Sequence, residues 1–254
     1  MKNRLLLTLF ATTALLHAQP VKFPIFEANF NGPGKGIELV NGAVLGAPGS
    51  GVSGKSDDRA YVGTPASTEQ ERNGPVAVAR KPIAPNALSV FTCTFWYYLD
   101  ETGPVLQVPL STAGILFLMH DKGFELRIEN QPEVPRAYVF TPGLSGPCAG
   151  WRDRKQWIFA AFSWEQKTNT LIVFQGTPKQ PVAYMRDMTG PMPANASMPR
   201  EDLGRDPETI GNTSRTLDRP LAGKMDNVRF YDRVLEQREL EIIRKADLAN
   251  QPVK

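Results

Sequence analysis

The stretch GSGVSGKS at residues 49–56 fits the phosphate-binding pattern G-x-x-x-x-G-K-[ST]. In a working phosphate loop a buried strand precedes the glycines and a helix follows them, so that the helix N-terminus and the glycine amides hold the phosphates. Here Asp57 and Asp58 follow, and their charge would repel phosphate; the next run, RAYVG, is strand-like. We therefore predict a glycine- and serine-rich surface turn at this place, and no bound nucleotide.

Residues for other kinds of catalysis are sparse. Beyond the first 18 residues the chain has one histidine, His120, which stands beside Asp121 at a strand end. One histidine and two distant cysteines cannot form a zinc cluster. A Ser/His/Asp arrangement would need a serine partner for His120, and no pattern in the sequence indicates one. These observations favour a protein that is not an enzyme.

The first 18 residues have the pattern of a secretory signal peptide. Lys2 and Arg4 precede an apolar run over residues 5–16, and Ala18 is a small residue suited to a cleavage site. The run is short for a membrane span, and the alternative is a buried N-terminal helix. We predict that residues 1–18 are removed and that residues 19–254 form one domain that is secreted, periplasmic or at the cell surface, with no membrane span.

The charge of the chain is close to balanced. The formal net charge is +3, from 29 Lys and Arg against 26 Asp and Glu, and loss of Lys2 and Arg4 lowers it to +1. A near-neutral surface offers no basic field for nucleic acid or anionic lipid, so neither is an expected partner.

The remaining sequence reads as strands followed by one helix. In ALSVFTCTFWYYLD (87–100), β-branched and aromatic residues alternate, with Phe91, Cys93, Phe95 and Tyr97 on one face and Thr92, Thr94, Trp96 and Tyr98 on the other. Hairpins are expected for GILFLMH with FELRIEN and for QWIFAAFSWE with TLIVFQG, a long loop over 185–206, and a late strand in LAGKMDNVRFYDRVL. The apolar stripe of LEQRELEIIRKADL predicts a helix that covers one sheet. The fold class is all-β, a two-sheet antiparallel sandwich with one short C-terminal helix.

Two cysteines, Cys93 and Cys148, allow a disulfide in an exported chain. Cys93 lies in the strand described above and Cys148 in the loop-like SGPCAG. A buried free thiol is the alternative, because unpaired cysteine is common in protein cores.

Several of these segments together resemble the laminin-G-like and pentraxin-like jelly rolls of the concanavalin A-like lectin/glucanase superfamily. The segments are LSVFTCTFWYYLD, WIFAAFSWEQKTNTLIVFQG, TIGN and LAGKMDNVRFYDRVLEQRELEII, in that order, and the most specific element runs from Gly223 to Leu235. The resemblance implies two stacked antiparallel sheets of about six or seven strands each. The cysteines that pentraxins pair across this fold are replaced here by Thr94 and Ala161.

The resemblance also implies a structural calcium site, although the acidic cluster that holds calcium in pentraxins has no counterpart in IGNTSRT. Glu27 in the first strand and Asp226 in the late strand match positions that bind calcium elsewhere in the superfamily. Two carboxylates are few for this ion, so backbone carbonyls would have to complete its shell. The alternative is a solvated Glu27 and an Asp226 that caps a turn.

For function, the resemblance implies an exported, non-catalytic binding or adhesion module with a glycan as its ligand. The rings expected to contact sugar are Tyr61, Tyr98 and Trp151, whereas Trp96 is expected to be structural. The E-x-D-x-x-E run of the glucanases is missing, and the adjacent Asp100 and Glu101 would point to opposite faces of a strand. The alternatives are a scaffold that binds an extracellular or cell-surface protein and a divergent glycan-cleaving enzyme.

Overall fold

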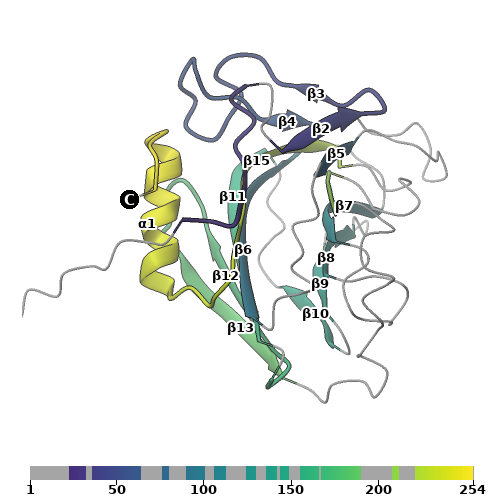
Figure 1. The fold of residues 1–254 in the computed structure, drawn as a ribbon, viewed down its shortest axis with the longest axis vertical. Helices are drawn as coiled ribbons and strands as arrows, with labels where there is room; N and C mark the ends of the chain where they lie inside the picture. The colour runs from purple at the N-terminus through teal and green to yellow at the C-terminus, as the bar shows by residue number, and fades with distance from the viewer. Residues whose placement is uncertain are drawn as a thin grey trace, which may run out of the picture.

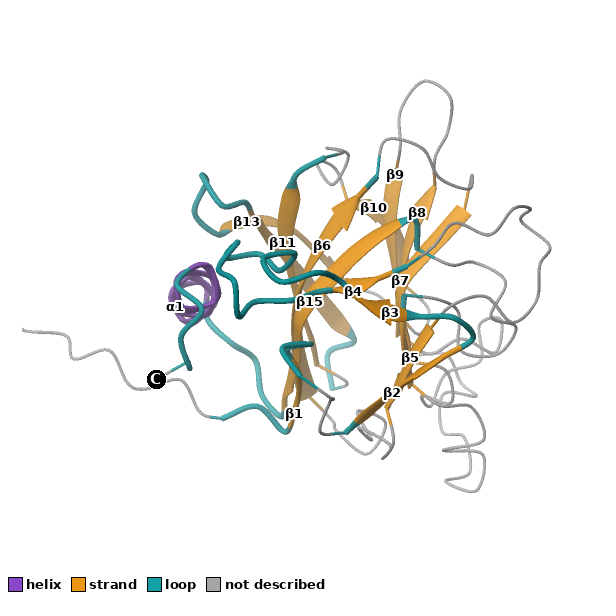
Figure 2. Cartoon of the chain, turned by 90° about the horizontal axis from the view of Figure 1, so that it is seen from above, coloured by secondary structure: helices purple, strands orange, loops and turns teal. Residues whose placement is uncertain are grey.

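The computed structural model describes residues 23–32, 36–63, 76–79, 90–100, 106–112, 124–129, 136–141, 144–148, 155–165, 167–189, 208–211 and 221–253. Within them, the chain forms two antiparallel sheets and one helix, so the predicted fold class is confirmed. The helix, α1 (Gln237–Leu248), lies on the outer side of one sheet, and the second sheet lies on the other side (Figures 1 and 2).

The larger sheet has eight strands. Its order is β13-β12-β11-β6-β15-β4-β3, and β1 pairs with β15 off this path. The strands are β1 (Phe26–Ala28), β3 (Val44–Leu45), β4 (Tyr61–Val62), β6 (Val90–Leu99), β11 (Trp157–Glu165), β12 (Thr170–Gly176), β13 (Ala183–Thr189) and β15 (Gly223–Tyr231). We call it the helix-side sheet.

The second sheet has seven strands in the order β10-β9-β8-β7-β14-β5-β2. They are β2 (Ile37–Val40), β5 (Val76–Ala79), β7 (Leu106–Thr112), β8 (Phe124–Glu129), β9 (Arg136–Thr141), β10 (Leu144–Cys148) and β14 (Glu208–Ile210). The strands β6 and β15 lie in the middle of the helix-side sheet. One face of these strands packs against the second sheet, and the other face packs against α1.

Alternation along β6 divides its side chains between two hydrophobic cores, as the sequence predicts. Phe91, Cys93, Phe95 and Tyr97 belong to the core between the sheets, together with Ile37, Ala77 and Ile210 of the second sheet. Trp96 points the opposite way and packs with Phe159, Phe174, Leu240 and Ile243 under α1. Successive residues of a strand face opposite sides, so one ten-residue strand supplies both layers.

Helix α1 begins after Glu236, within the segment in which the sequence predicts a helix. A capping box joins Glu236 and Glu239, each side chain accepting a bond from the other residue's backbone N–H. Leu240 and Ile243 form the buried stripe that was expected, and Leu235 before the helix is buried as well. The predicted cover on the sandwich is therefore confirmed.

Most predicted elements are present, with two corrections. The hairpin of β11 and β12, the late strand β15 and the strand at FELRIEN (β8) are confirmed. The hairpin expected between GILFLMH and FELRIEN is wrong, because β8 pairs with β7 on one side and with β9 on the other. The loop expected over 185–206 is wrong at its start, since Ala183–Thr189 forms β13 and pairs with β12. The sequence of this segment has little strand pattern of its own, and the segment is a strand because it pairs with β12. GILFLMH lies outside the described residues.

No helix among the described residues is long and apolar enough to cross a membrane. The predicted signal peptide, residues 1–18, lies outside the described residues.

Candidate functional site

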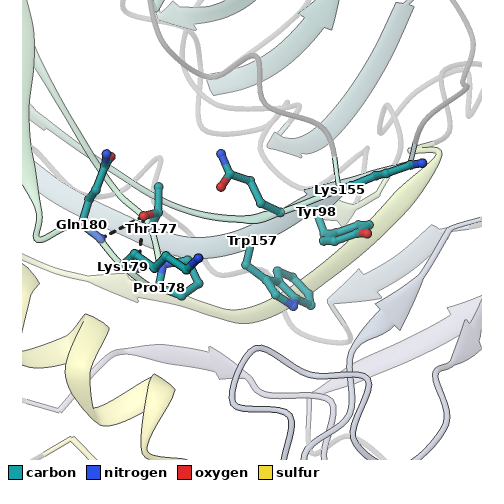
Figure 3. A pocket seen from close by; sticks show the side chains of 8 residues that line it. Tyr98, Lys155, Trp157, Thr177, Pro178, Lys179 and Gln180 are labelled. Atoms are coloured by element: carbon teal, nitrogen blue, oxygen red, sulfur yellow. Dashed lines mark hydrogen bonds between the residues drawn. The ribbon is translucent and has the colours of Figure 1, made fainter.

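A pocket opens on the outer face of the helix-side sheet, next to the area that α1 covers. It has a volume of about 580 Å³ and is lined by Tyr98, Lys155, Gln156, Trp157, Thr177, Pro178, Lys179 and Gln180. We call it the Tyr98–Trp157 pocket. Figure 3 shows the two rings and Lys155 on one side and the turn residues 177–180 on the other. Its size falls in the range of small-ligand sites.

Strand register places the two rings side by side. Trp157, the first residue of β11, pairs with Tyr98, the next-to-last residue of β6. On its other side, Tyr98 pairs with Lys224 of β15. The ring centroids of Tyr98 and Trp157 lie 5.7 Å apart with an interplanar angle of 62°, an edge-to-face contact. Both side chains are half-buried, which leaves ring surface accessible to a ligand.

The far wall of the pocket is the turn between β12 and β13. The Thr177 hydroxyl accepts bonds from the backbone N–H groups of Lys179 (3.2 Å) and Gln180 (3.0 Å), and the Thr177 N–H donates to the Gln180 carbonyl. Such side-chain-to-backbone bonds hold a turn in one conformation. The turn is therefore shaped before any ligand arrives.

Helix α1 fastens this turn through one arginine. Arg244 donates from Nη1 to the Thr177 carbonyl at 2.6 Å, while its Nε and Nη2 bind the two oxygens of Glu241 at 2.7 and 2.8 Å. Gly176 makes room for it, because a Cβ there would lie 2.9 Å from Arg244 Cδ. The bond from Arg244 lowers the pKa of Glu241 to about 2. The helix thus positions a wall of the pocket as well as covering the sheet.

The three rings expected to contact ligand have different places. Tyr98 lies in the pocket. Tyr61 does not: it is fully buried in the core between the sheets, 6.0 Å from Phe30 between ring centroids, so its assignment as a binding ring is wrong. Trp151 lies outside the described residues, as does His120. Trp96 is buried beneath α1, in the structural role expected for it.

Trp157 lines the pocket but is not among the rings that the sequence analysis proposed. Its segment, QWIFAAFSWE, looks like a core strand, and seven of the nine residues of β11 are in fact buried. The available signal was the alternation itself, which puts Trp157 on the same face as Phe159 and Ala161 and opposite Ile158. Only the register shows that it stands beside Tyr98.

Glu27 and Asp226, the expected calcium ligands, have separate partners. Glu27 stands opposite Arg229 in the β1–β15 ladder, and its Oε1 accepts from Arg229 Nε at 2.7 Å. Arg229 Nη1 also contacts Asp247 Oδ1 of α1 at 2.8 Å, and Asp247 Oδ2 accepts from Trp96 Nε1 at 2.9 Å. A guanidinium thus supplies the positive charge beside Glu27 and ties β1, β15 and α1 together.

Asp226 points instead toward the loop at residues 49–58. Its two oxygens accept from the N–H groups of Val52 (2.9 Å) and Asn227 (2.8 Å), while Asp58 accepts from Ser53 (2.8 Å). Asp58 Oδ1 is buried and has no hydrogen-bond partner. With both Asp226 oxygens engaged and Glu27 paired with Arg229, these residues do not fit a calcium ion between Glu27 and Asp226. Among the described residues, no three His, Cys, Asp or Glu side chains gather as a metal site.

The phosphate-loop match has a structural role. The loop joins β3 to β4 and no helix follows it, so the strand–loop–helix context of a phosphate loop is missing. Its lysine, Lys55, donates to the Ala249 carbonyl at the C-terminal end of α1, where a cation is favourable. Val52 is buried against the core under α1. The expected surface turn is therefore a loop that also anchors the helix.

The disulfide between Cys93 and Cys148 is not formed in this structure. Cys93 is a free thiol, fully buried among the aromatic side chains between the sheets. Burial raises the pKa of this thiol well above its usual value. The alternative of a buried free cysteine is the one observed.

Two buried carboxyl groups, those of Asp247 and Asp226, predict that the stability of the fold depends on pH. Burial raises the pKa of Asp247 to about 6. Burial, and to a lesser extent the negative charge of Asp58, raises the pKa of Asp226. Both groups bind protons more tightly in the folded protein, so the stabilisation they give at low pH is lost as pH rises above about 4, and for Asp247 as pH rises through about 6. Glu241, with its lowered pKa, stabilises above about 4.5 and loses this as pH falls toward 2. We expect the free energy of unfolding, measured by urea denaturation, to fall as pH rises from 5 to 7.5.

Asp226→Asn removes one of the two raised carboxyls and should reduce the loss of stability between pH 5 and 7.5. Asp232→Asn, at an exposed position just after β15, is the matched control and should leave the pH profile unchanged. A wild-type protein that gains stability from pH 5 to 7.5 would contradict this account.

Two stacked antiparallel sheets with a ring-lined pocket on the outside define a lectin-like β-sandwich. Residues 70–241 match a laminin-G-type family model described as the concanavalin A-like lectin/glucanases superfamily. The match spans well over half of the sequence, and the chain belongs to this superfamily. The resemblance noted from the sequence is thereby confirmed. No curated protein sequence matches the chain.

Solved structures share the fold at low sequence identity. The CBM40 of the Ruminococcus gnavus IT-sialidase, bound to α2,3 sialyllactose, has a TM-score of 0.51 and 13% identity, covering 87% of this chain and 99% of its own. The enzymatically active domain of tailspike protein 2 from bacteriophage CBA120 has a TM-score of 0.54 and 9% identity, covering 96% of this chain and 33% of its own. A heptameric SAP-like pentraxin from Limulus polyphemus has a TM-score of 0.41 and 9% identity, covering 62% of this chain and 70% of its own.

Proposed function

We propose that the chain is an exported carbohydrate-binding module and that the Tyr98–Trp157 pocket holds the sugar. The observation that carries the proposal is the pair of accessible rings in a pocket whose wall is held rigid by Arg244. Aromatic rings cover the apolar faces of sugars, and the polar groups of Gln156 and Gln180 in the lining can meet hydroxyls. Export rests on the pattern of residues 1–18.

The lining of the pocket favours binding over hydrolysis. Glycoside hydrolysis of the usual kind needs two carboxyl groups beside the scissile bond. None of the eight lining residues carries a carboxylate. The CBM40 neighbour, whose fold this chain shares, was solved with a bound saccharide, which is consistent with a binding role for such a fold.

A glycan array probed with residues 19–254 tests the proposal, followed by titration of the best saccharide against variants. Trp157→Ala should weaken binding at least about tenfold, because truncating an aromatic anchor commonly costs ~2 kcal/mol or more. Tyr184→Ala is the control, since Tyr184 is an exposed ring on β13 that does not line the pocket. Repeating the titration with a calcium chelator tests whether calcium contributes.

Four results would count against the proposal. A flat array would remove it, and a protein captured at the same face would favour the scaffold alternative. Equal binding by wild type and Trp157→Ala would move the sugar site elsewhere. Release of shortened glycan on prolonged incubation would favour the enzyme alternative.

A further inference from the structure

We propose that the ligand of the Tyr98–Trp157 pocket is an anionic saccharide, one with a carboxylate or a sulfate ester, held between Lys224 and Lys179. This inference rests on the proposed function and adds the chemical class of the sugar. It depends on three features of the described residues: the place of Lys224, the place of Lys179, and the charge of the residues between them.

Lys224 is fixed beside one of the two rings. It stands directly opposite Tyr98 in the β15–β6 ladder, and its Nζ lies 5.1 Å from the centroid of the Tyr98 ring. This is a cation–π contact, which holds the ammonium group without neutralising its charge. Lys224 is half-buried, so part of its side chain is accessible to solvent.

Lys179 lies on the other side of the ring pair. The strand order β15-β6-β11-β12 puts Lys224, Tyr98, Trp157 and the turn after β12 in one row across the sheet. In Figure 3 the Lys179 side chain extends toward Trp157 from that turn. Its backbone N–H is bound by Thr177 Oγ1, and the Thr177 carbonyl is bound by Arg244. The base of this lysine is therefore held in place although its side chain is exposed.

The charge around the rings is one-sided. The lining contains two lysines and no carboxylate, and of these lysines Lys155 has an interaction of its own, which leaves Lys179 as the charge in the lining that the proposal uses. Glu241, which binds the Val182 N–H just beyond the turn, has both oxygens occupied by Arg244. Asp100, which follows the last residue of β6, also has an interaction of its own. We therefore expect this site to bind an anionic saccharide more tightly than the corresponding neutral one.

The matched probes are an oligogalacturonide and its fully methyl-esterified form, which differ in charge and keep the same sugar rings. Lactose, sialyllactose and sulfated lactose distinguish a carboxylate from a sulfate ester. We expect the acidic member of each pair to bind more tightly, with an affinity that falls as salt rises from 50 to 300 mM, since salt screens exposed charges. The variants are Lys179→Gln, Lys224→Gln and both together.

Each lysine substitution should weaken binding of the acidic probe about threefold, as for a partly exposed ion pair, and leave binding of the neutral probe unchanged. Lys179→Arg and Lys224→Arg should retain binding. Lys167→Gln is the control, because Lys167 lies in the loop at the opposite end of the β11–β12 hairpin. Thermal unfolding of each variant checks that the fold is kept.

The outcomes separate the two proposals. Equal affinity for the acidic and esterified probes, lost in Trp157→Ala, would overturn the anionic assignment and leave the sugar site standing. Preference for the acidic probe that persists in the double lysine variant would also overturn the assignment. Absence of binding to every saccharide would remove the proposed function itself. Preference for the sulfated or for the carboxylated probe supports the assignment and identifies the acidic group.

Discussion

Arg229→Met is expected to lower the free energy of unfolding by about 3–5 kcal/mol, the usual result of removing one partner of a buried ion pair. Arg229 and Asp247 are both almost fully buried, with 4% and 1% of their side chains exposed. Burial by itself would lower the pKa of the Arg229 guanidinium, but Asp247 and Glu27 raise it above its ordinary value. Without the guanidinium, Asp247 would be left in the interior with only Trp96 as a donor. Urea denaturation at pH 7.5 measures the effect.

A control variant and a double variant test whether the loss comes from the buried ion pair. Arg233→Met breaks a pair with Glu239 that is more exposed, and it should cost only about 0.2–1 kcal/mol. The double variant Arg229→Met with Asp247→Asn removes both charges and keeps an acceptor for Trp96, so it should recover much of the loss. If Arg229→Met cost no more than Arg233→Met, the ion pair would not hold α1 on the sheet.

Gly223→Ala is expected to cost about 3 kcal/mol or more, at or above the upper end for inserting one methyl group into a packed site. A Cβ at Gly223 would lie 1.9 Å from the Tyr98 carbonyl oxygen and 3.2 Å from Leu99 Cα. These are backbone atoms of the neighbouring strand, so the β15–β6 ladder must separate to admit the methyl group. Because Tyr98 carries one of the pocket rings, the variant should also weaken saccharide binding.

Gly32→Ala is the matched substitution for Gly223→Ala. A Cβ there would meet nothing within 4 Å, so its free energy of unfolding should stay within about 0.5 kcal/mol of wild type. Urea unfolding of both variants, with titration of the acidic saccharide where the variant folds, compares them directly. Similar stability of the two glycine variants would show that β15 and β6 are not packed as closely as the structure has them.

Much of the fold follows from local pattern. The alternation in β6 and the apolar stripe of α1 depend on side chains that each segment carries itself, and both layers are where that pattern places them. The same logic identifies Trp96 as structural. It fails at residues 185–189, where a strand is stabilised by its partner β12 and its own composition does not indicate one.

The site was less accessible to such reasoning. Tyr98 and Tyr61 were both proposed as sugar-contacting rings on the strength of the resemblance. Tyr98 lies in the pocket, but Tyr61 is buried, and a short strand of two residues has no alternation from which to infer burial. Glu27 was paired with Asp226, whereas the ladder sets it against Arg229. A carboxylate identified by motif has no partner until the register is known.

The sequence by itself determined the class of the protein: an all-β sandwich of the concanavalin A-like superfamily with a helix over one face. Only the tertiary structure decided which residues meet: Trp157 with Tyr98, Arg244 with the turn at Thr177, and Lys55 with the end of α1. The physical reason is that hydrophobic periodicity acts within a segment, whereas these contacts join residues 59 to 194 positions apart. Distances of that kind are set by strand order and register, which a linear pattern does not carry.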